Sequence, residues 1–334
     1  MTTLYVREQG ARVVREGERI RVMRGQETLH EAAVRELEQV VVYGNVQVTT
    51  QAATLLVQQD VDVVFYSSHG RFRFRLLQGG LRYARLRQAQ LRLSDDAAAT
   101  LATAQAVVRG KLENQGRLLE ALAKEKPALS RALPGIRQMA TGSGQARTLD
   151  ELRGFEGKGA AFYFEALKTL VPPAWGFHGR AYYPPPDPWN ATLSFGYSLL
   201  LKDVGAAAQL VGLDAYVGFF HALEANRPSL LLDLMEEFRP LVDGVCLGLL
   251  AQGRLPLAEY RRRADEERPV EMGPALLPVL IEAYEERLEG KERYGLSGEQ
   301  TTLRRCLELQ ARQMAALILG QGRSYRPLAL SFGG

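Results

Sequence analysis

The spacing of apolar residues changes once along the chain, at the Gly79-Gly80 pair, and this change constrains the fold more than any other feature. Before the pair, β-branched and apolar residues form short runs broken by glycines, which is typical of strands. After it, apolar residues recur at the three- and four-residue intervals of amphipathic helices. The sequence therefore predicts an α+β protein, in which a small N-terminal β-domain is joined by a linker to a larger all-α domain.

We expect the β-domain at residues 1–75, the linker at 76–92, the helical domain at 93–320 and a loose tail at 321–334. Strands are expected at residues 3–6, 11–14, 19–22, 40–43, 46–49, 61–66 and 71–75, with a short helix at 50–59. Helices of the larger domain are expected at residues 91–108, 111–125, 148–170, 190–211, 229–252, 272–289 and 298–319, with loops at 142–144 and 171–189.

Composition narrows the class of protein. The 334 residues are 46% hydrophobic and 24% charged, which is typical of a soluble globular protein. No run approaches the roughly 20 apolar residues that cross a bilayer, and the N-terminal segment lacks the features of a signal peptide. Cys246 and Cys306 are far apart, which argues against a disulfide framework or a cysteine-based zinc site. We therefore expect a cytoplasmic protein with no membrane partner.

Basic residues are concentrated in one short region. The net charge of +4 is a mild excess, which is compatible with a polyanionic partner. Alternation in the segment RFRFR places its three arginines on one face of a strand. This density suits contact with a polyanion, and a salt-bridged surface near the linker is the alternative. The basic residues of this region are Arg71, Arg73, Arg75, Arg82, Arg85, Arg87 and Arg92.

A histidine and two acidic residues form the strongest candidate constellation. His221 follows two phenylalanines, and after a polar break a helix opens with Ser229 as its expected N-cap. On that helix Asp233 and Glu236 are three residues apart, so their side chains project from one face. The simpler interpretation is a packing histidine and a solvated acidic face, with Arg239 as the partner of Glu236. The spacing alone does not decide between the two.

Glu156 offers a further carboxylate. It precedes Gly157 and Gly159 in the segment LRGFEGKGAAFYFEAL. A carboxylate in the opening turn of a helix has a structural explanation, because the helix dipole favours acids there. If Glu156 lies near His221 and Glu236, however, the three form a set of two carboxylates and one imidazole. Such a set suits Mg²⁺ or Mn²⁺ better than zinc.

Three segments, in this order and spacing, resemble the CRISPR-associated spacer integrases, the Cas1 family, over nearly the whole chain. The segments are a glutamate motif with Glu156-Gly157, Ala160-Ala161 and Tyr163-Phe164, a loop-and-helix signature with Asp187–Ala191 and Leu193–Tyr197, and a histidine–carboxylate motif with Gly218-Phe219, His221, Arg227, Ser229-Leu230, Asp233-Leu234, Glu236, Phe238–Pro240 and Asp243.

The resemblance implies a chemistry and a ligand set. Glu156, His221 and Glu236 would bind Mg²⁺ or Mn²⁺, with Asp233 as an acidic support, although many family members have Asp where this chain has Glu236. The implied reaction is attack of a spacer 3′-hydroxyl on a phosphodiester at the repeat boundary, a transesterification. Hydrolysis of branched DNA would use the same site, and a bound metal would activate the attacking oxygen and stabilise charge on the phosphate.

The resemblance also implies partners and supporting residues. We expect a homodimer formed through the β-domain, a small partner protein (Cas2), and double-stranded and branched DNA. Arg239 and Tyr163 are candidates for residues behind the metal ligands. The arginine-rich stretch 71–92 and Arg239 are candidate DNA contacts, since phosphate contact needs a high density of positive charge. Arg227 is a further candidate phosphate contact, with a helix cap or a carboxylate partner as the alternative. The aromatic residues of the proline-rich loop would either stack on unpaired bases or pin the loop to the core: Trp175, Phe177, Tyr182 and Tyr183.

Two other functions remain open at this point. The chain would be a scaffold if it binds DNA without catalysis, although its three expected ligands are all competent side chains. The other is a metal-dependent hydrolase that acts on a different substrate. A weak dependence of DNA affinity on salt concentration would favour it, because binding through phosphate neutralisation weakens steeply as salt rises.

Overall fold

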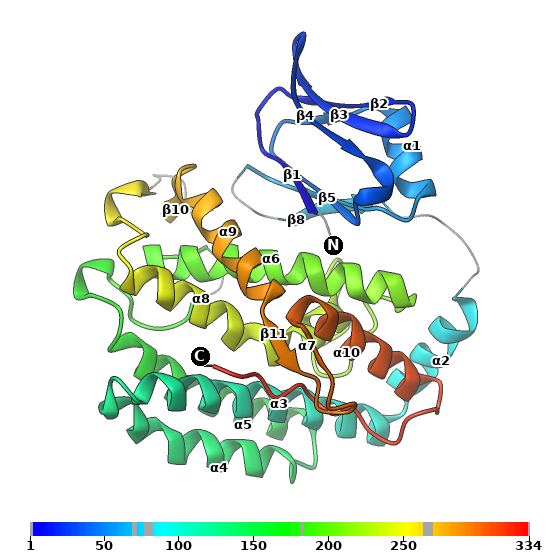
Figure 1. Ribbon diagram of the computed structural model, residues 1–334. Helices are drawn as coiled ribbons and strands as arrows, with labels where there is room; N and C mark the ends of the chain where they lie inside the picture. Colours follow the sequence, from blue (N-terminus) through cyan, green and yellow to red (C-terminus); the bar gives the residue numbers. More distant parts are fainter. Residues whose placement is uncertain (1–2, 69–71, 77–82, 182–183, 263–269, 333–334) are drawn as a thin grey trace. The chain divides into compact units, whose positions relative to one another are not determined.

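The computed structural model describes residues 3–68, 72–76, 83–181, 184–262 and 270–332 (Figure 1). The chain separates into two compact units, Met1–Arg82 and Tyr83–Gly334. The first is built mainly of strands and the second mainly of helices, so the predicted fold class is confirmed. The second unit begins earlier than expected, because helix α2 (Ala84–Asp95) occupies most of the predicted linker. Gly79 and Gly80 lie outside the described residues.

The described residues of the first unit form two four-stranded sheets, one α-helix and a short 3-10 turn, η1 (Val34–Glu36). Helix α1 (Thr50–Gln58) is capped by Thr49, whose side chain accepts from the Ala52 amide. The core between these elements is rich in valine, and the central strand β5 is buried throughout. Strand β4 (Glu27–Ala33) was not predicted, because most of its residues are exposed and polar. The sheets run β1 (Thr3–Val6), β5 (Gln39–Tyr43), β7 (Asp62–Tyr66), β8 (Phe72–Leu76) and β4, β3 (Arg19–Arg24), β2 (Arg12–Glu16), β6 (Gln47–Val48).

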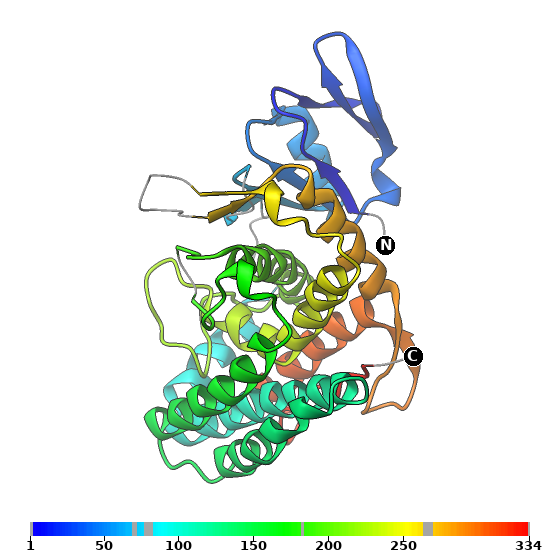
Figure 2. The same cartoon turned by 90° about the vertical axis from the view of Figure 1, so that its left-hand side faces the viewer.

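Helices α3 (Ala97–Ala123), α4 (Leu133–Ser143) and α5 (Leu149–Lys168) pack against one another as one layer of the second unit (Figures 1 and 2). The sequence predicted a break in α3 near Gly110, but the helix continues through it. A Cβ at Gly110 would overlap the ring of Pro327, so the glycine permits close packing rather than a turn. Likewise the loop predicted at 142–144 begins only at Gly144, because α4 includes the two residues before it.

Helix α6 (Pro188–Val211) is the centre of the second unit. Asp187 caps it by accepting from the Asn190 amide, and Trp189 is fully buried in its first turn. The expected helix at 229–252 is interrupted by a short 3-10 turn, η4 (Glu236–Phe238). Two antiparallel strand pairs were not predicted: β9 (Tyr260–Arg262) with β10 (Val270–Met272), and β11 (Lys291–Arg293) with β12 (Gln300–Thr302). Helices packed against α6 are α7 (Ser229–Met235), α8 (Arg239–Ala251), α9 (Leu276–Glu289) and α10 (Leu303–Ile318).

The C-terminal segment is packed, although the sequence suggested a loose tail. Tyr325 and Leu328 are each 3% exposed, and the Leu330 amide donates to Asn114 Oδ1 of α3 at 3.0 Å. Both carboxylate oxygens of Glu237 accept from this region: Tyr325 Oη donates at 2.5 Å, and the Leu328 amide donates to the other oxygen. The prediction of a loose tail was wrong because the segment is held by polar contacts with Glu237 and Asn114, and such contacts produce no periodic pattern of apolar residues in the sequence.

Replacing Glu237 with alanine is expected to lower the free energy of unfolding by about 3 kcal/mol, since three buried donors lose their acceptor. Those donors are Tyr325, Gln310 and the Leu328 amide. Urea denaturation monitored by circular dichroism measures the change. Glu165→Ala, at a side chain 70% exposed on α5, is the matched control and is expected to change stability by less than about 0.5 kcal/mol. Equal effects in the two variants would refute the anchoring role.

Within the described parts of the chain, no helix combines the length and apolar character needed to span a membrane.

Candidate active site

His221 is held in a fixed orientation by Asp233. The Asp233 carboxylate accepts from three consecutive backbone amides, those of Phe219, Phe220 and His221, at 2.6–3.0 Å. Its Oδ1 also lies 2.7 Å from His221 Nδ1. Because a carboxylate only accepts, a neutral His221 ring carries its proton on Nδ1 and directs the lone pair of Nε2 the other way.

The loop that carries His221 approaches α7 very closely. A Cβ on Gly218 would come within 2.8 Å of Asp233 Oδ2 and 2.7 Å of the Ser229 backbone, so only glycine fits there. Ser229 was predicted to be the N-cap of α7, but Pro228 occupies that position and Ser229 is the first residue of the helix. Its hydroxyl instead donates to the Ala222 carbonyl at 2.6 Å, which ties the loop to the start of the helix. Asp233 is 1% exposed, so the predicted alternative of a solvated acidic face is wrong.

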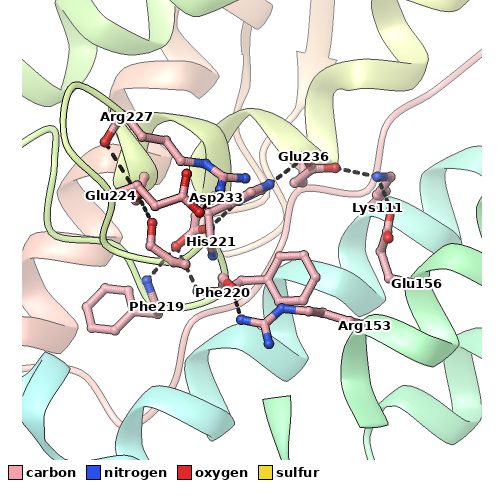
Figure 3. A network of polar contacts seen from close by, with 12 residues as sticks. Lys111, Arg153, Glu156, Phe219, Phe220, His221, Glu224, Arg227, Asp233 and Glu236 are labelled. Atoms are coloured by element: carbon pink, nitrogen blue, oxygen red, sulfur yellow. Dashed lines mark hydrogen bonds and ion pairs between the residues drawn. The ribbon is translucent and has the colours of Figure 1, made fainter. Parts of the chain in front are cut away.

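Glu236 lies beyond the free nitrogen of His221. Its Oε1 is 3.8 Å from His221 Nε2 and accepts from Arg239 Nε at 2.9 Å (Figure 3). Burial raises the pKa of this carboxyl, but the positive charges of Arg239 and Lys111, with His221, outweigh burial and lower it to about 2. Glu236 is therefore a buried, fully ionised carboxylate at neutral pH.

Lys111 joins Glu236 to Glu156, and sequence analysis did not predict its role. Its Nζ lies 2.5 Å from Glu156 Oε1 and 2.6 Å from Glu236 Oε2 (Figure 3). Glu156 is in the middle of α5, so the explanation of it as an opening-turn charge is wrong; Asp150 and Glu151 fill that role. The available signal was a lysine at a position where the apolar pattern of α3 demands a buried residue.

A second buried layer supports Glu236 from behind. The guanidinium of Arg239 stacks on the Tyr197 ring, 4.8 Å from its centroid. The Tyr197 hydroxyl donates to Asp243 at 2.5 Å, and Tyr163 donates to the other oxygen of Asp243 at 2.7 Å. Arg239 thus contacts Glu236 directly and is buried against protein groups, whereas Tyr163 is connected to Arg239 through Asp243 and Tyr197.

The Asp243 carboxyl gives a testable dependence of stability on pH. Burial raises its pKa to about 6, although the two tyrosine hydroxyls and nearby arginines act to lower it. A raised pKa means that the folded protein binds a proton more tightly, so this stabilisation is present below pH 3.8 and is lost as the pH rises to about 6. The free energy of unfolding of Asp243→Asn is expected to lack this loss, which is roughly 1–3 kcal/mol. Urea titrations from pH 4 to 7 measure it, and parallel curves for the two proteins would contradict the assignment.

The predicted DNA-contact arginines fall into different environments. Arg75 in the first unit is 12% exposed at its side chain and lies 3.0 Å from Asp62 in an ion pair, which matches the salt-bridge alternative. Arg227 pairs with Glu224 at 2.8 Å, again the carboxylate alternative. Arg73 and Arg85 are exposed on β8 and α2 respectively. Arg71 and Arg82 lie outside the described residues.

The aromatic residues of the proline-rich loop are packing residues where the structure describes them. Trp175 and Phe177 are each 5% exposed and meet the Trp189 ring edge to face. They pin the loop to α6, which was one of the two predicted alternatives. Tyr182 and Tyr183 lie outside the described residues.

Glu156, Glu236 and His221 form a donor set that fits a hard divalent cation, although the Lys111 ammonium lies between the two carboxylates. Glu156 and Glu236 each direct a carboxylate oxygen at the Lys111 ammonium, at 2.5 Å and 2.6 Å. Oxygen donors with one imidazole suit Mg²⁺ or Mn²⁺. In the portion of the chain that is described, no three histidine, cysteine, aspartate or glutamate side chains form a ready-made cage for a metal.

Known proteins resemble this chain in sequence and in fold. The chain is 38% identical over 331 residues to the CRISPR-associated endonuclease Cas1 1 of Thermus thermophilus, covering 98% of this chain and 99% of the relative. It is 33% identical over 330 residues to Cas1 3 of the same organism, covering 98% and 97%. A solved Cas1 protein from Thermotoga maritima superposes with a TM-score of 0.81 at 20% identity, covering 97% of this chain and 99% of that one. A casposase bound to its integration product gives 0.84 at 22% identity, covering 98% and 93%.

The fold defines a class of protein with a β-rich unit and a helical unit. In the helical unit, Glu156, Glu236 and the oriented His221 come together, and Lys111 lies between the two glutamates. The family profile described as CRISPR associated protein Cas1 matches residues 4–286. The chain belongs to the Cas1 family, as the resemblance of its motifs implied.

Proposed function

We propose that this protein is a divalent-metal-dependent DNA endonuclease and integrase that inserts new spacers into a CRISPR array. The observation that carries the proposal is the convergence of Glu156, Glu236 and the oriented His221 within one buried cluster of the helical unit. Family membership supports it, since the matched relatives are named as CRISPR-associated endonucleases. The solved relatives include a casposase bound to an integration product and a Cas1–Cas2 complex.

The proposed reaction is a transesterification. The 3′-oxygen of the incoming DNA forms a bond to a target phosphorus, and the bond from that phosphorus to the target strand's 3′-oxygen breaks. The proton lost by the attacking hydroxyl is balanced by the proton gained by the leaving oxygen. With water in place of the 3′-hydroxyl, the same displacement is hydrolysis, which explains how one site would serve as both integrase and nuclease.

Each residue of the site has a proposed part. Glu156, His221 and Glu236 would hold Mg²⁺ or Mn²⁺, which supplies a Lewis acid and neutralises charge on the phosphate. Asp233 orients His221 through the Nδ1 contact, and this arrangement of a carboxylate behind a histidine is common around metal ligands. Arg239 fixes one oxygen of Glu236 and keeps it ionised.

We propose double-stranded and branched DNA as substrates, a homodimer, and a small Cas2 protein as partner. Part of one chain of a solved Cas6-RT-Cas1–Cas2 complex superposes on this chain, with a TM-score of 0.85 at 21% identity, covering 98% of this chain and 36% of that one. Exposed Arg73 and Arg85 remain candidates for phosphate contacts. Because the proposed target is array DNA in the cell, we place the activity in the cytoplasm.

Metal dependence is tested by strand transfer of a labelled DNA duplex into a plasmid that carries a repeat, with Cas2 supplied. We expect joined product with Mn²⁺ or Mg²⁺ and none after chelation by EDTA, with activity restored when metal is added in excess. Product that persists in chelator would overturn the assigned chemistry. DNA binding that is steeply sensitive to salt but gives no product with any metal would instead favour a non-catalytic scaffold.

A further inference from the structure

We propose that the Lys111 ammonium is an internal substitute for the metal, and that metal binding is an exchange in which the divalent ion displaces this ammonium from between Glu156 and Glu236. The inference rests on the proposed function and adds a residue outside the expected ligand set. Lys111 is a positioning residue in this account: it holds the two glutamates ready in the metal-free protein and lowers the affinity of the site for metal.

The geometry is that of a cation site already filled. Lys111 comes from α3, Glu156 from α5 and Glu236 from η4, so three separate elements meet at one nitrogen. Nζ lies 2.5 Å and 2.6 Å from the two carboxylates (Figure 3). The Lys111 and Glu236 side chains are 5% and 3% exposed, so water screens this charge cluster weakly. Two carboxylates directed at one point, that of Glu236 buried and that of Glu156 20% exposed, require a positive charge there.

The contact with Glu236 favours exchange. Glu236 Oε2 is held by the Lys111 ammonium in an ion pair at 2.6 Å, whereas Oε1 accepts from Arg239. Oε2 is therefore the oxygen that a metal ion would take over from the ammonium, while Arg239 keeps Oε1 in place. A divalent ion between the same two oxygens would lie next to Nζ and repel it strongly. The ammonium and the metal therefore compete for one place.

Lys111→Met removes the ammonium but keeps an unbranched side chain only one atom shorter, and it has two measurable consequences. In the metal-free protein Glu156 and Glu236 lose their shared cation, so the melting temperature is expected to fall. With metal present the competing charge is gone, so the Kd for Mn²⁺ is expected to decrease by at least about tenfold. The gain in melting temperature on adding Mn²⁺ is therefore larger in the variant than in the wild type.

The experiment is a titration of the full chain with Mn²⁺ in the absence of DNA, in which electron paramagnetic resonance reports the free ion. Lys158→Met is the matched control, because it removes the same charge from an exposed lysine two residues after Glu156 on α5. We expect its Kd to stay within about twofold of the wild type. His221→Ala is expected to weaken binding, which ties the signal to this site. Thermal unfolding with and without Mn²⁺ is recorded for every variant.

Each outcome decides between the claims. A Kd for Lys111→Met equal to or higher than that of the wild type would overturn the exchange, since it would mean that the ammonium supports the metal. If the wild type itself binds no Mn²⁺ in a manner sensitive to His221→Ala, the proposed function fails as well. Should Lys111→Met not fold, Lys111→Gln tests the same point, because its amide can donate to both carboxylates without carrying charge.

Discussion

Replacing His221 with alanine is expected to reduce strand transfer by at least about a hundredfold, because it removes the imidazole donor from the proposed metal site. The His221 side chain is 15% exposed and the polar contacts of its ring are with the carboxylates of Asp233 and Glu236, so its loss leaves the helices intact. The fold should therefore survive while the activity does not. Strand transfer with Mn²⁺ and Cas2 measures the activity, and circular dichroism verifies the fold.

His178→Ala is the matched control for this substitution. His178 is exposed in the proline-rich loop and belongs to neither the donor set nor its supports. We expect strand transfer by this variant to remain within about twofold of the wild type. If His221→Ala remained as active as His178→Ala, the imidazole would have no part in the chemistry.

Replacing Asp233 with asparagine is expected to raise the Kd for Mn²⁺ by about 10–100-fold and to slow strand transfer with it. The amide keeps the shape of the side chain, but its NH₂ group would face donors that the carboxylate now accepts from. These donors are the amides of Phe219 and Phe220, together with His221. The variant should also lose about 2 kcal/mol of stability, since at least one buried amide is left without an acceptor.

The two effects of Asp233→Asn are separable. A purely structural role would lower the melting temperature without changing the Kd for metal at a temperature where the variant is folded. Asp95→Asn, at an exposed acid at the end of α2, controls for the loss of one negative charge. An unchanged Kd for Mn²⁺ in folded Asp233→Asn would contradict the orienting role.

Much of the site was predictable, because spacing within one helix fixes which side chains share a face. Asp233 and Glu236 were expected on one face, and both are buried in the cluster. The different roles of these two carboxylates were not predictable. The three backbone amides that donate to Asp233 belong to the loop segment 219–221, and the pattern of side chains in a sequence does not show where backbone amides point. As a result, Asp233 is a support for His221, whereas Glu236 faces the proposed metal position.

Contacts between distant segments account for the features that sequence patterns missed. Lys111 and Glu156 are 45 residues apart, and only the packing of α3 on α5 brings them together. Gly110 has the signature of a helix break, but its use is to let the ring of Pro327 approach α3. The ordered C-terminal segment depends on Glu237 and Asn114, two polar residues whose partners lie far along the chain.

The integrase is distinguished from a hydrolase by supplying the attacking 3′-hydroxyl or withholding it. The wild-type protein is incubated with Cas2, Mn²⁺, a repeat-bearing plasmid and a labelled duplex that ends either in a 3′-hydroxyl or in a 3′-deoxy terminus. We expect label joined to the repeat boundary with the 3′-hydroxyl, none with the 3′-deoxy end, and none with either end in His221→Ala. Nicking of the plasmid that proceeds equally with both ends, with no label joined, would contradict it, because the protein would then be a hydrolase rather than an integrase.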